Sequence, residues 1–99
     1  MASVTTLLKR REKVLGKIYD NLGFLIGSIS SKGLKYEAYN LTTKINGLTK
    51  TKHIPKDMLP LVRKMTRRHQ KLKVLLKELS EVNWLLVREG EELKSYGPL

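Results

Sequence analysis

A regular hydrophobic repeat between residues 58 and 93 constrains the fold more than any other feature of the chain. In heptad notation its d positions are apolar throughout, while its a positions include a histidine, an asparagine and a glycine. This pattern predicts one long amphipathic helix over residues 57–93. Steps of four and three residues connect Met58, Val62, Met65, His69, Leu72, Leu76, Leu79, Asn83, Leu86, Gly90 and Leu93.

Two arrangements of this helix are consistent with the repeat. In the first, the face formed by the a and d positions, which we call the seam, pairs with the same face of a second copy. A polar residue at an a position then selects a two-stranded assembly. A helix of this length spans ~50 Å, which the rest of a 99-residue chain cannot wrap, so we expect a homodimer. In the second, the helix packs within its own monomer, because apolar g positions widen the face. The dimer residues would be Leu72, Leu76, Leu79, Asn83 and Leu86, and the widening residues are Leu61, Leu75 and Val82.

The net charge of +11 is unevenly distributed along the chain. Residues 50–77 contain ten Lys and Arg against one acidic residue, Asp57, whereas five acidic residues follow from Glu78 onward. A basic surplus of this size indicates a polyanionic partner. The alternative is an antiparallel pair of helices in which each basic half lies beside the acidic half of the other, with the charge serving assembly or solubility.

Composition excludes several classes of protein. The chain has no cysteine, which excludes a disulfide framework and a zinc ribbon. Its apolar runs are too short to span a bilayer, and the N-terminus lacks the apolar core of a signal peptide. We expect a soluble cytoplasmic protein without a membrane partner.

The chain before the long helix predicts an α+β fold in a single domain of residues 1–99. Residues 3–22 have helical periodicity, and Ser3, Thr5 or Thr6 can cap the helix. Residues 24–54 form a β region, with strands expected at 24–31, 35–45 and 48–54. Asn46-Gly47 predicts a type I′ hairpin turn, because both positions need positive φ.

This turn fixes a register, and the register sorts side chains between the two faces of the sheet. One face is mostly apolar and should pack on the helices; it pairs Ile45 with Leu48, Thr43 with Lys50, Leu41 with Lys52 and Tyr39 with Ile54. The other face is polar and should point outward; it holds Tyr36, Ala38, Asn40, Thr42 and Lys44 across from Thr49, Thr51 and His53.

The sequence shows no catalytic constellation. The two histidines, His53 and His69, have no metal-ligand spacing with carboxylates, and no glycine-rich loop is placed to hold a phosphate. We therefore expect neither an enzyme nor a cofactor, a metal or a small-molecule substrate.

A polar sheet next to a basic helix favours binding of double-stranded DNA. Small sheets fit the major groove, where Thr, Asn and Lys meet base edges, while Lys and Arg meet phosphates. Contact of the helix alone with phosphates is the other mode of DNA binding. RNA is also compatible with the charge, although few rings are present for single-strand stacking. The candidate nucleic-acid residues are Lys44, Thr49, Lys50, Thr51, Lys52, His53, Lys56, Arg63, Lys64, Arg67, Arg68 and Lys71.

Several short motifs resemble a family of small uncharacterised prokaryotic proteins that are associated with mobile elements. The motifs are residues 24–29 (FLIGSI), Tyr36 and Tyr39, residues 50–56 (KTKHIPK), and the leucine-rich helix ending at residues 79–83 (LSEVN). The resemblance covers residues 7–88 and implies an N-terminal helix, a short β region and a C-terminal helix. Many relatives carry cysteines in the β region, which this chain lacks, so no metal site is implied. The order of sheet and helix is also similar to the arm-type DNA-binding domains of integrases.

These observations combine into one interpretation and one alternative. The interpretation is a small basic homodimer that binds DNA as an accessory or regulatory factor of a virus, plasmid or transposon. The alternative is a protein-interaction module, an inhibitor or assembly adaptor, that places its basic face on an acidic partner.

Overall fold

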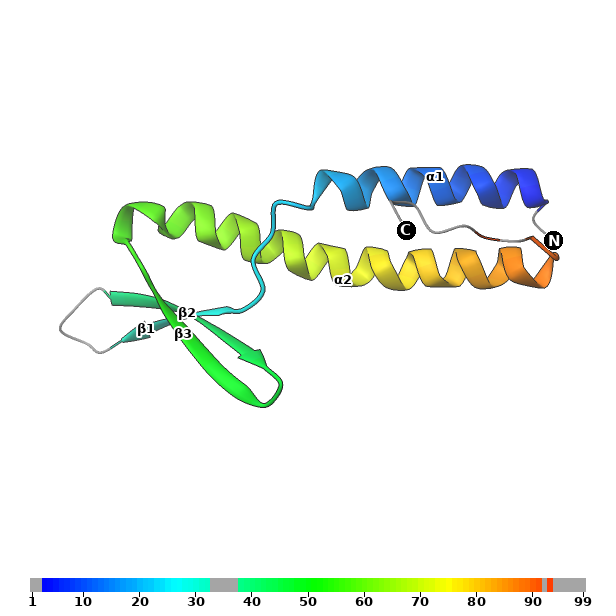
Figure 1. Cartoon of the computed structure of the whole chain (residues 1–99). Coiled ribbons are helices and arrows are strands. Elements are labelled where there is room, and N and C mark those ends of the chain that lie inside the picture. Colours follow the sequence, from blue (N-terminus) through cyan, green and yellow to red (C-terminus); the bar gives the residue numbers. More distant parts are fainter. Residues whose placement is uncertain (1–2, 33–37, 92, 94–99) are drawn as a thin grey trace. The chain divides into compact units, whose positions relative to one another are not determined.

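The computed structural model describes residues 3–32, 38–91 and 93. It confirms the predicted α+β class, with an N-terminal helix, a three-stranded antiparallel sheet and a long C-terminal helix (Figure 1). The elements in chain order are α1 (Val4–Asp20), β1 (Ser28–Lys32), β2 (Ala38–Ile45), β3 (Leu48–Ile54), a 3-10 helix η1 (Lys56–Met58) and α2 (Leu59–Arg88).

Local chemistry explains the start of α1 and the end of α2. At the start of α1, the Thr6 backbone N–H donates to Ser3 Oγ at 3.2 Å, which is the expected N-cap bond. At the end of α2, the Gly90 N–H donates to the Val87 carbonyl and the Glu91 N–H donates to the Leu86 carbonyl, both at 3.0 Å. This pair of bonds is a Schellman motif, and it ends the helix at Arg88, whereas the apolar repeat of the sequence continues to residue 93.

The β region differs from the prediction at its beginning. Strand β1 starts at Ser28, whereas the sequence placed a strand from residue 24. The Leu25 N–H donates to the Met65 carbonyl of α2 at 3.1 Å, so this segment is bonded to the helix and not to a neighbouring strand. Strand β2 begins at Ala38, and the expected residues 35–37 lie outside the described residues.

The hairpin between β2 and β3 confirms the predicted turn and register. Asn46 and Gly47 have φ of 51° and 79°, the positive values that a type I′ turn requires. Ile45 pairs with Leu48, Thr43 with Lys50, Leu41 with Lys52, and Tyr39 with Ile54. Because the register is as predicted, the assignment of side chains to alternate faces follows from it.

The chain divides into two compact units. Unit 1 consists of Met1–Asp20 and Leu72–Leu99, and unit 2 consists of Asn21–Lys71. Helix α2 contributes its residues 59–71 to unit 2 and its residues 72–88 to unit 1.

Unit 1 is an antiparallel helix pair, with α1 alongside the second half of α2 (Figure 1). Its core cluster consists of Leu7, Val82 and Leu86, and further along the pair Val14, Leu72 and Leu75 are also buried. Leu93, beyond the end of α2, packs against the same cluster. Unit 1 therefore uses the apolar face of α2 inside the monomer.

Unit 2 packs one face of the sheet on the first half of α2. Leu41, Ile54 and Val62 form its buried cluster, and Leu25, Ile29, Tyr39 and Leu59 lie against it. The apolar face predicted from the register is thus the one that contacts the helix.

Neither of the described helices combines the length and the hydropathy of a membrane span.

Candidate nucleic-acid interface

Most of the net charge belongs to unit 2. Residues 21–71 contain eleven of the twenty Lys and Arg but two of the nine acidic residues, which gives a formal charge of +9. The remaining residues, those of unit 1, carry nine basic and seven acidic groups and a formal charge of +2. The basic surplus is therefore concentrated in the unit that contains the sheet.

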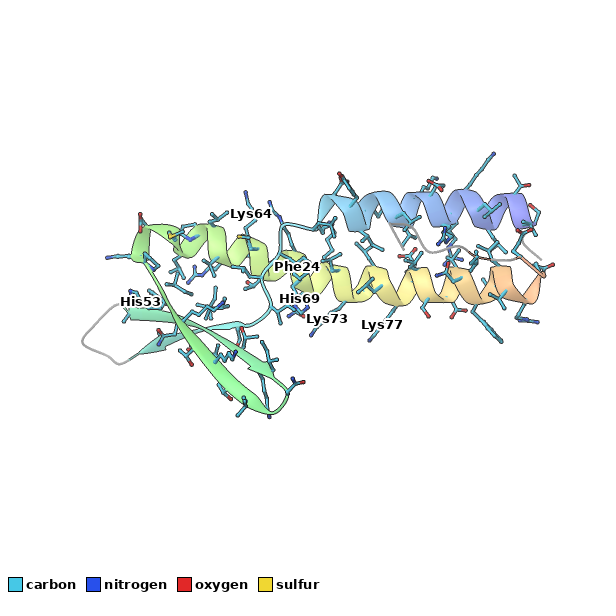
Figure 2. The ribbon with its side chains drawn as sticks, in the orientation of Figure 1. Phe24, His53, Lys64, His69, Lys73 and Lys77 are labelled. Atoms are coloured by element: carbon cyan, nitrogen blue, oxygen red, sulfur yellow. The ribbon has the colours of Figure 1, made fainter. Side chains whose placement is uncertain are left out.

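The first half of α2 presents a row of exposed cations that we call the basic ridge: Arg63, Lys64, Arg67 and Lys71. At about 100° per residue, Lys64, Arg67 and Lys71 lie roughly 140–200° around the helix from the buried Val62, which faces the sheet. Figure 2 shows Lys64 on the side of α2 away from the strands. No acidic residue occurs between positions 58 and 77, so the ridge has no carboxylate on its own helix nearby.

Arg68 does not belong to the ridge, although the sequence grouped it with the phosphate-binding residues. Its Nη1 donates to the carbonyl oxygen of Gly23 at 2.8 Å, and the side chain is half-buried. A Cβ on Gly23 would lie 3.1 Å from the same Nη1. Arg68 therefore helps to fasten the segment before β1 to the helix.

His69 is part of the same attachment. Its ring stacks on Phe24, with centroids 5.6 Å apart and an interplanar angle of 22° (Figure 2). Its Nδ1 is buried, and no described residue is its hydrogen-bond partner. The histidine that the heptad pattern placed in the seam is thus covered by the chain's own Phe24.

The outer face of the sheet is polar across all three strands. The register aligns Ser28, Thr42 and Thr51 in one row and Ser30, Asn40 and His53 in the next. Thr49, Thr51, His53 and Lys44 are exposed, and none of these outer-face residues is acidic.

Asn40 departs from its predicted exposure, because it is 6% exposed. It lies on the central strand, between Ser30 on one side and His53 on the other. Asn40 is therefore not available on the outer face as the sequence suggested.

The predicted nucleic-acid residues fall on separate surfaces of unit 2. The ridge is on the side of α2 away from the sheet, whereas Lys44, Thr49, Thr51 and His53 lie on the side of the sheet away from α2. Alternation along β3 places Lys50 and Lys52 on the helix-facing side of this strand. Lys56 lies in η1, where it is exposed and already takes part in an interaction.

The residues predicted to form a dimer do not share one exposed surface, because some of them are buried within the monomer and others are exposed. Leu72 and Leu86 are buried within the monomer, at 4% and 0% exposure, and Leu79 is half-buried. Leu76 is 54% exposed, and Trp84 and Val87, at 58% and 50%, are exposed on the same half of α2. At ~100° per residue these three side chains fall within a sector of roughly 80°.

Asn83 has a partner that the sequence analysis missed. Its Oδ1 accepts a hydrogen bond from Nε of Arg11 at 2.8 Å, and Arg11 is 7% exposed. The spacing of Leu7, Arg11 and Val14 follows the helical period, and this could have revealed Arg11 on the buried face. The polar a position thus serves a buried arginine of its own chain.

Other site chemistry is limited in the part of the chain that the structure describes. There, no group of three or more His, Cys, Asp and Glu is placed to hold a metal ion.

In comparisons with known proteins, no family model, curated protein or solved structure matches the chain. The resemblance to mobile-element proteins therefore stays a prediction.

Proposed function

We propose that unit 2 binds double-stranded DNA and that the basic ridge supplies the phosphate contacts. The observation that carries the proposal is the charge of +9 on this unit, against +2 on unit 1. A mere gain in solubility would not require the surplus to be confined to one unit. Neutralising phosphates with Lys and Arg releases condensed counterions, which is the main source of affinity for a basic surface on DNA.

The dimensions of the ridge suit a nucleic-acid backbone. Lys64 and Lys71 are seven residues apart, which is ~10 Å along a helix axis. Each DNA strand carries one phosphate per ~3.4 Å of duplex axis, so a ridge of this length can lie alongside several phosphates of one strand. Lys and Arg stems on an exposed helix also reach outward without disturbing the core.

The outer sheet face offers the other mode of binding, through hydroxyl groups and His53 in a major groove. Among the exposed side chains described on this face, Lys44 is the basic one. Because the ridge and this face point in opposite directions, one straight duplex cannot contact both on the same protomer. We assign the affinity to the ridge and not to the sheet.

Self-association is the second part of the proposal. Since Leu72 and Leu86 are already buried, the surface for a second copy is the exposed sector of Leu76, Trp84 and Val87. Unit 1 carries little net charge, so two copies can meet there without bringing two strongly basic units into contact. Such a dimer would present paired ridges to DNA half-sites.

The family resemblance suggests the biological setting of this dimer, which is a role as accessory factor of a virus, plasmid or transposon.

The experiment compares three probes: a short fluorescent DNA duplex, an RNA duplex of the same sequence and a polyglutamate peptide. Binding is followed by anisotropy for the unmodified chain and three variants. The ridge variant is Lys64→Ala with Arg67→Ala, the sheet variant is Thr51→Ala with His53→Ala, and the charge-matched control is Lys9→Ala with Lys13→Ala.

We expect the ridge variant to bind DNA roughly 10-fold or more weakly, while the sheet variant and the control keep their affinity. Equal loss in the ridge variant and the control would refute the assignment to the ridge. Preference for polyglutamate over DNA would support the alternative of an acidic protein partner, and preference for the RNA duplex would change the class of nucleic acid.

A further inference from the structure

The apolar face of the sheet continues beyond the part that α2 covers. Near α2, Leu41 and Ile54 are buried. Toward the turn, the next cross-strand pairs on the same face are Thr43 with Lys50 and Ile45 with Leu48, and Ile45 and Leu48 are 48% and 67% exposed. The half of this face near the turn is therefore more exposed than the half near α2.

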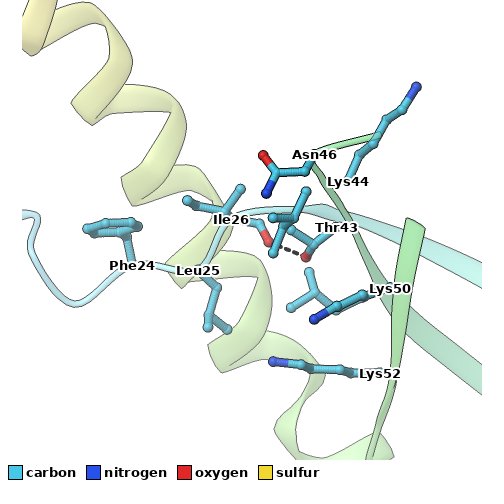
Figure 3. Close-up of a pocket in the computed structure, with 10 residues that line it drawn as sticks. Phe24, Leu25, Ile26, Thr43, Lys44, Asn46, Lys50 and Lys52 are labelled. Atoms are coloured by element: carbon cyan, nitrogen blue, oxygen red, sulfur yellow. Dashed lines mark hydrogen bonds between the residues drawn. The ribbon is translucent and has the colours of Figure 1, made fainter. Parts of the chain in front are cut away.

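The segment before β1 closes this more exposed half into a hollow of about 690 Å³. Phe24, Leu25 and Ile26 form one wall, and the β2–β3 hairpin forms the other (Figure 3). Thr43 Oγ1 donates to the Ile26 carbonyl oxygen at 2.6 Å and joins the two walls. The volume is in the range of small-molecule sites, ~300–1,000 Å³.

Gly27 holds the two walls at this separation. Its φ is +144°, and a Cβ at this position would lie 2.7 Å from the Thr42 carbonyl oxygen and 2.8 Å from Thr43 Oγ1. The backbone can approach β2 this closely because residue 27 has no side chain. The hollow is therefore set by backbone contacts and not by exposed side chains alone.

Two lysines of β3 give the hollow its charge. In Figure 3 the side chains of Lys50 and Lys52 extend toward Leu25 and Ile26, whereas Lys44 extends away. Among the described residues that line the hollow, none carries a carboxylate. An apolar floor with two ammonium groups at its rim is complementary to a molecule that has an apolar body and an anionic head.

We propose that this hollow binds an amphiphilic anion, such as an aliphatic carboxylate, free in solution. The apolar chain lies on Leu25, Ile26, Leu41 and Ile45, and the carboxylate meets Lys50 and Lys52. The site uses no residue of the basic ridge, so it is independent of the proposed DNA binding.

The test is an amide NMR titration of the full chain with decanoate, decanol and butyrate. Decanoate has both the chain and the charge, decanol lacks the charge, and butyrate lacks most of the chain. We expect decanoate to produce saturable shifts in residues 24–26, 41–46 and 50–52, and the other two to bind roughly 10-fold or more weakly. Equal binding of decanol and decanoate, or shifts spread over both units, would overturn the proposal.

Matched variants separate the lysines of the hollow from the general positive charge. Lys50→Gln with Lys52→Gln removes both charges and leaves polar side chains with shorter aliphatic stems. Both positions are exposed, so we expect an unchanged melting temperature and decanoate affinity reduced to that of decanol. Lys64→Gln with Lys71→Gln removes the same charge from the ridge and should leave decanoate binding unchanged. An equal loss in both variants would contradict a site at the hollow.

Phosphatidylcholine vesicles containing oleic acid test whether the ligand comes from a membrane and not from solution. Binding to these vesicles without binding of free decanoate would overturn the assignment to a soluble ligand.

Discussion

The bond between Arg11 and Asn83 makes a prediction that is opposite to the one from the heptad pattern. If Asn83 were a polar residue in a dimer seam, Asn83→Leu should raise stability, because leucine improves an apolar seam. In the structure, Asn83 Oδ1 accepts from Nε of the buried Arg11 at 2.8 Å. Asn83→Leu therefore removes an acceptor from a buried charged group, and we expect a less stable protein.

The magnitude follows from two opposing effects. Leaving a buried charged donor without its acceptor costs ~1.5–3 kcal/mol. Arg11 keeps another interaction and Asn83 is half-buried, so we take the lower part of this range. Leucine regains up to ~1 kcal/mol by burying apolar surface. The net loss is about 1 kcal/mol, which corresponds to a melting temperature lower by roughly 4–8 °C.

Urea unfolding followed by the fluorescence of Trp84, the single tryptophan, measures this loss next to the substituted position. Ser80→Leu adds a leucine at an exposed position of the same helix and should stay within ~0.5 kcal/mol of the unmodified chain. Arg11→Met combined with Asn83→Leu removes both partners, and the double-mutant cycle should give a coupling free energy of ~1–2 kcal/mol. An Asn83→Leu variant as stable as the unmodified chain, or more stable, would refute this account of the helix pair.

Four further predictions concern local geometry and assembly. Gly27→Ala should destabilise unit 2 by at least ~2 kcal/mol, because a Cβ meets the Thr42 carbonyl at positive φ, and unchanged thermal unfolding would contradict this. Gly47→Val, at φ +79° in open space, should cost on the order of 1 kcal/mol or more through turn strain and lower the amide-exchange protection of the β2–β3 hairpin, which full protection would disprove. Ser3→Ala should reduce stability by ~1 kcal/mol through loss of the N-cap bond, and Ser3→Asp, which restores an acceptor, is the control. Leu76→Glu should shift self-association to the monomer in sedimentation with little change in melting temperature, since Leu76 is exposed, and an unaltered dimer would exclude this surface.

The fold could be predicted from the sequence where local chemistry decides it. The Asn46-Gly47 turn sets the hairpin register through backbone φ alone, and the observed pairs agree with the prediction. The period of the long helix and the Ser3 cap also depend on near neighbours in the chain. These signals determine which elements form and which faces are apolar.

The partners of the apolar faces could not be predicted in the same way. Leucines at d positions gain equally from a helix of the same chain or of another, so periodicity does not separate α1 from a second copy. Arg11 and Asn83 are 72 positions apart, and the Leu25 N–H finds its acceptor on Met65. Such tertiary bonds leave no local pattern.

The candidate site was predicted in composition but not in arrangement. The basic residues near positions 50–71 are adjacent in sequence, yet helical rotation and strand alternation direct them to different surfaces. Arg68 is not one of the ridge residues, because its side chain is bonded to the Gly23 carbonyl oxygen. Lys50 and Lys52 line a hollow on the helix-facing side of the sheet.

The dependence of DNA affinity on salt tests the assignment of the basic ridge most directly. Four phosphate contacts per protomer, from Arg63, Lys64, Arg67 and Lys71, predict a slope of log affinity against log salt of roughly −3.6 for each bound protomer. Arg67→Ala should reduce the size of this slope by about 0.9, whereas Lys13→Ala in α1 should leave it unchanged. The same slope for Arg67→Ala, Lys13→Ala and the unmodified chain would contradict DNA binding through the ridge.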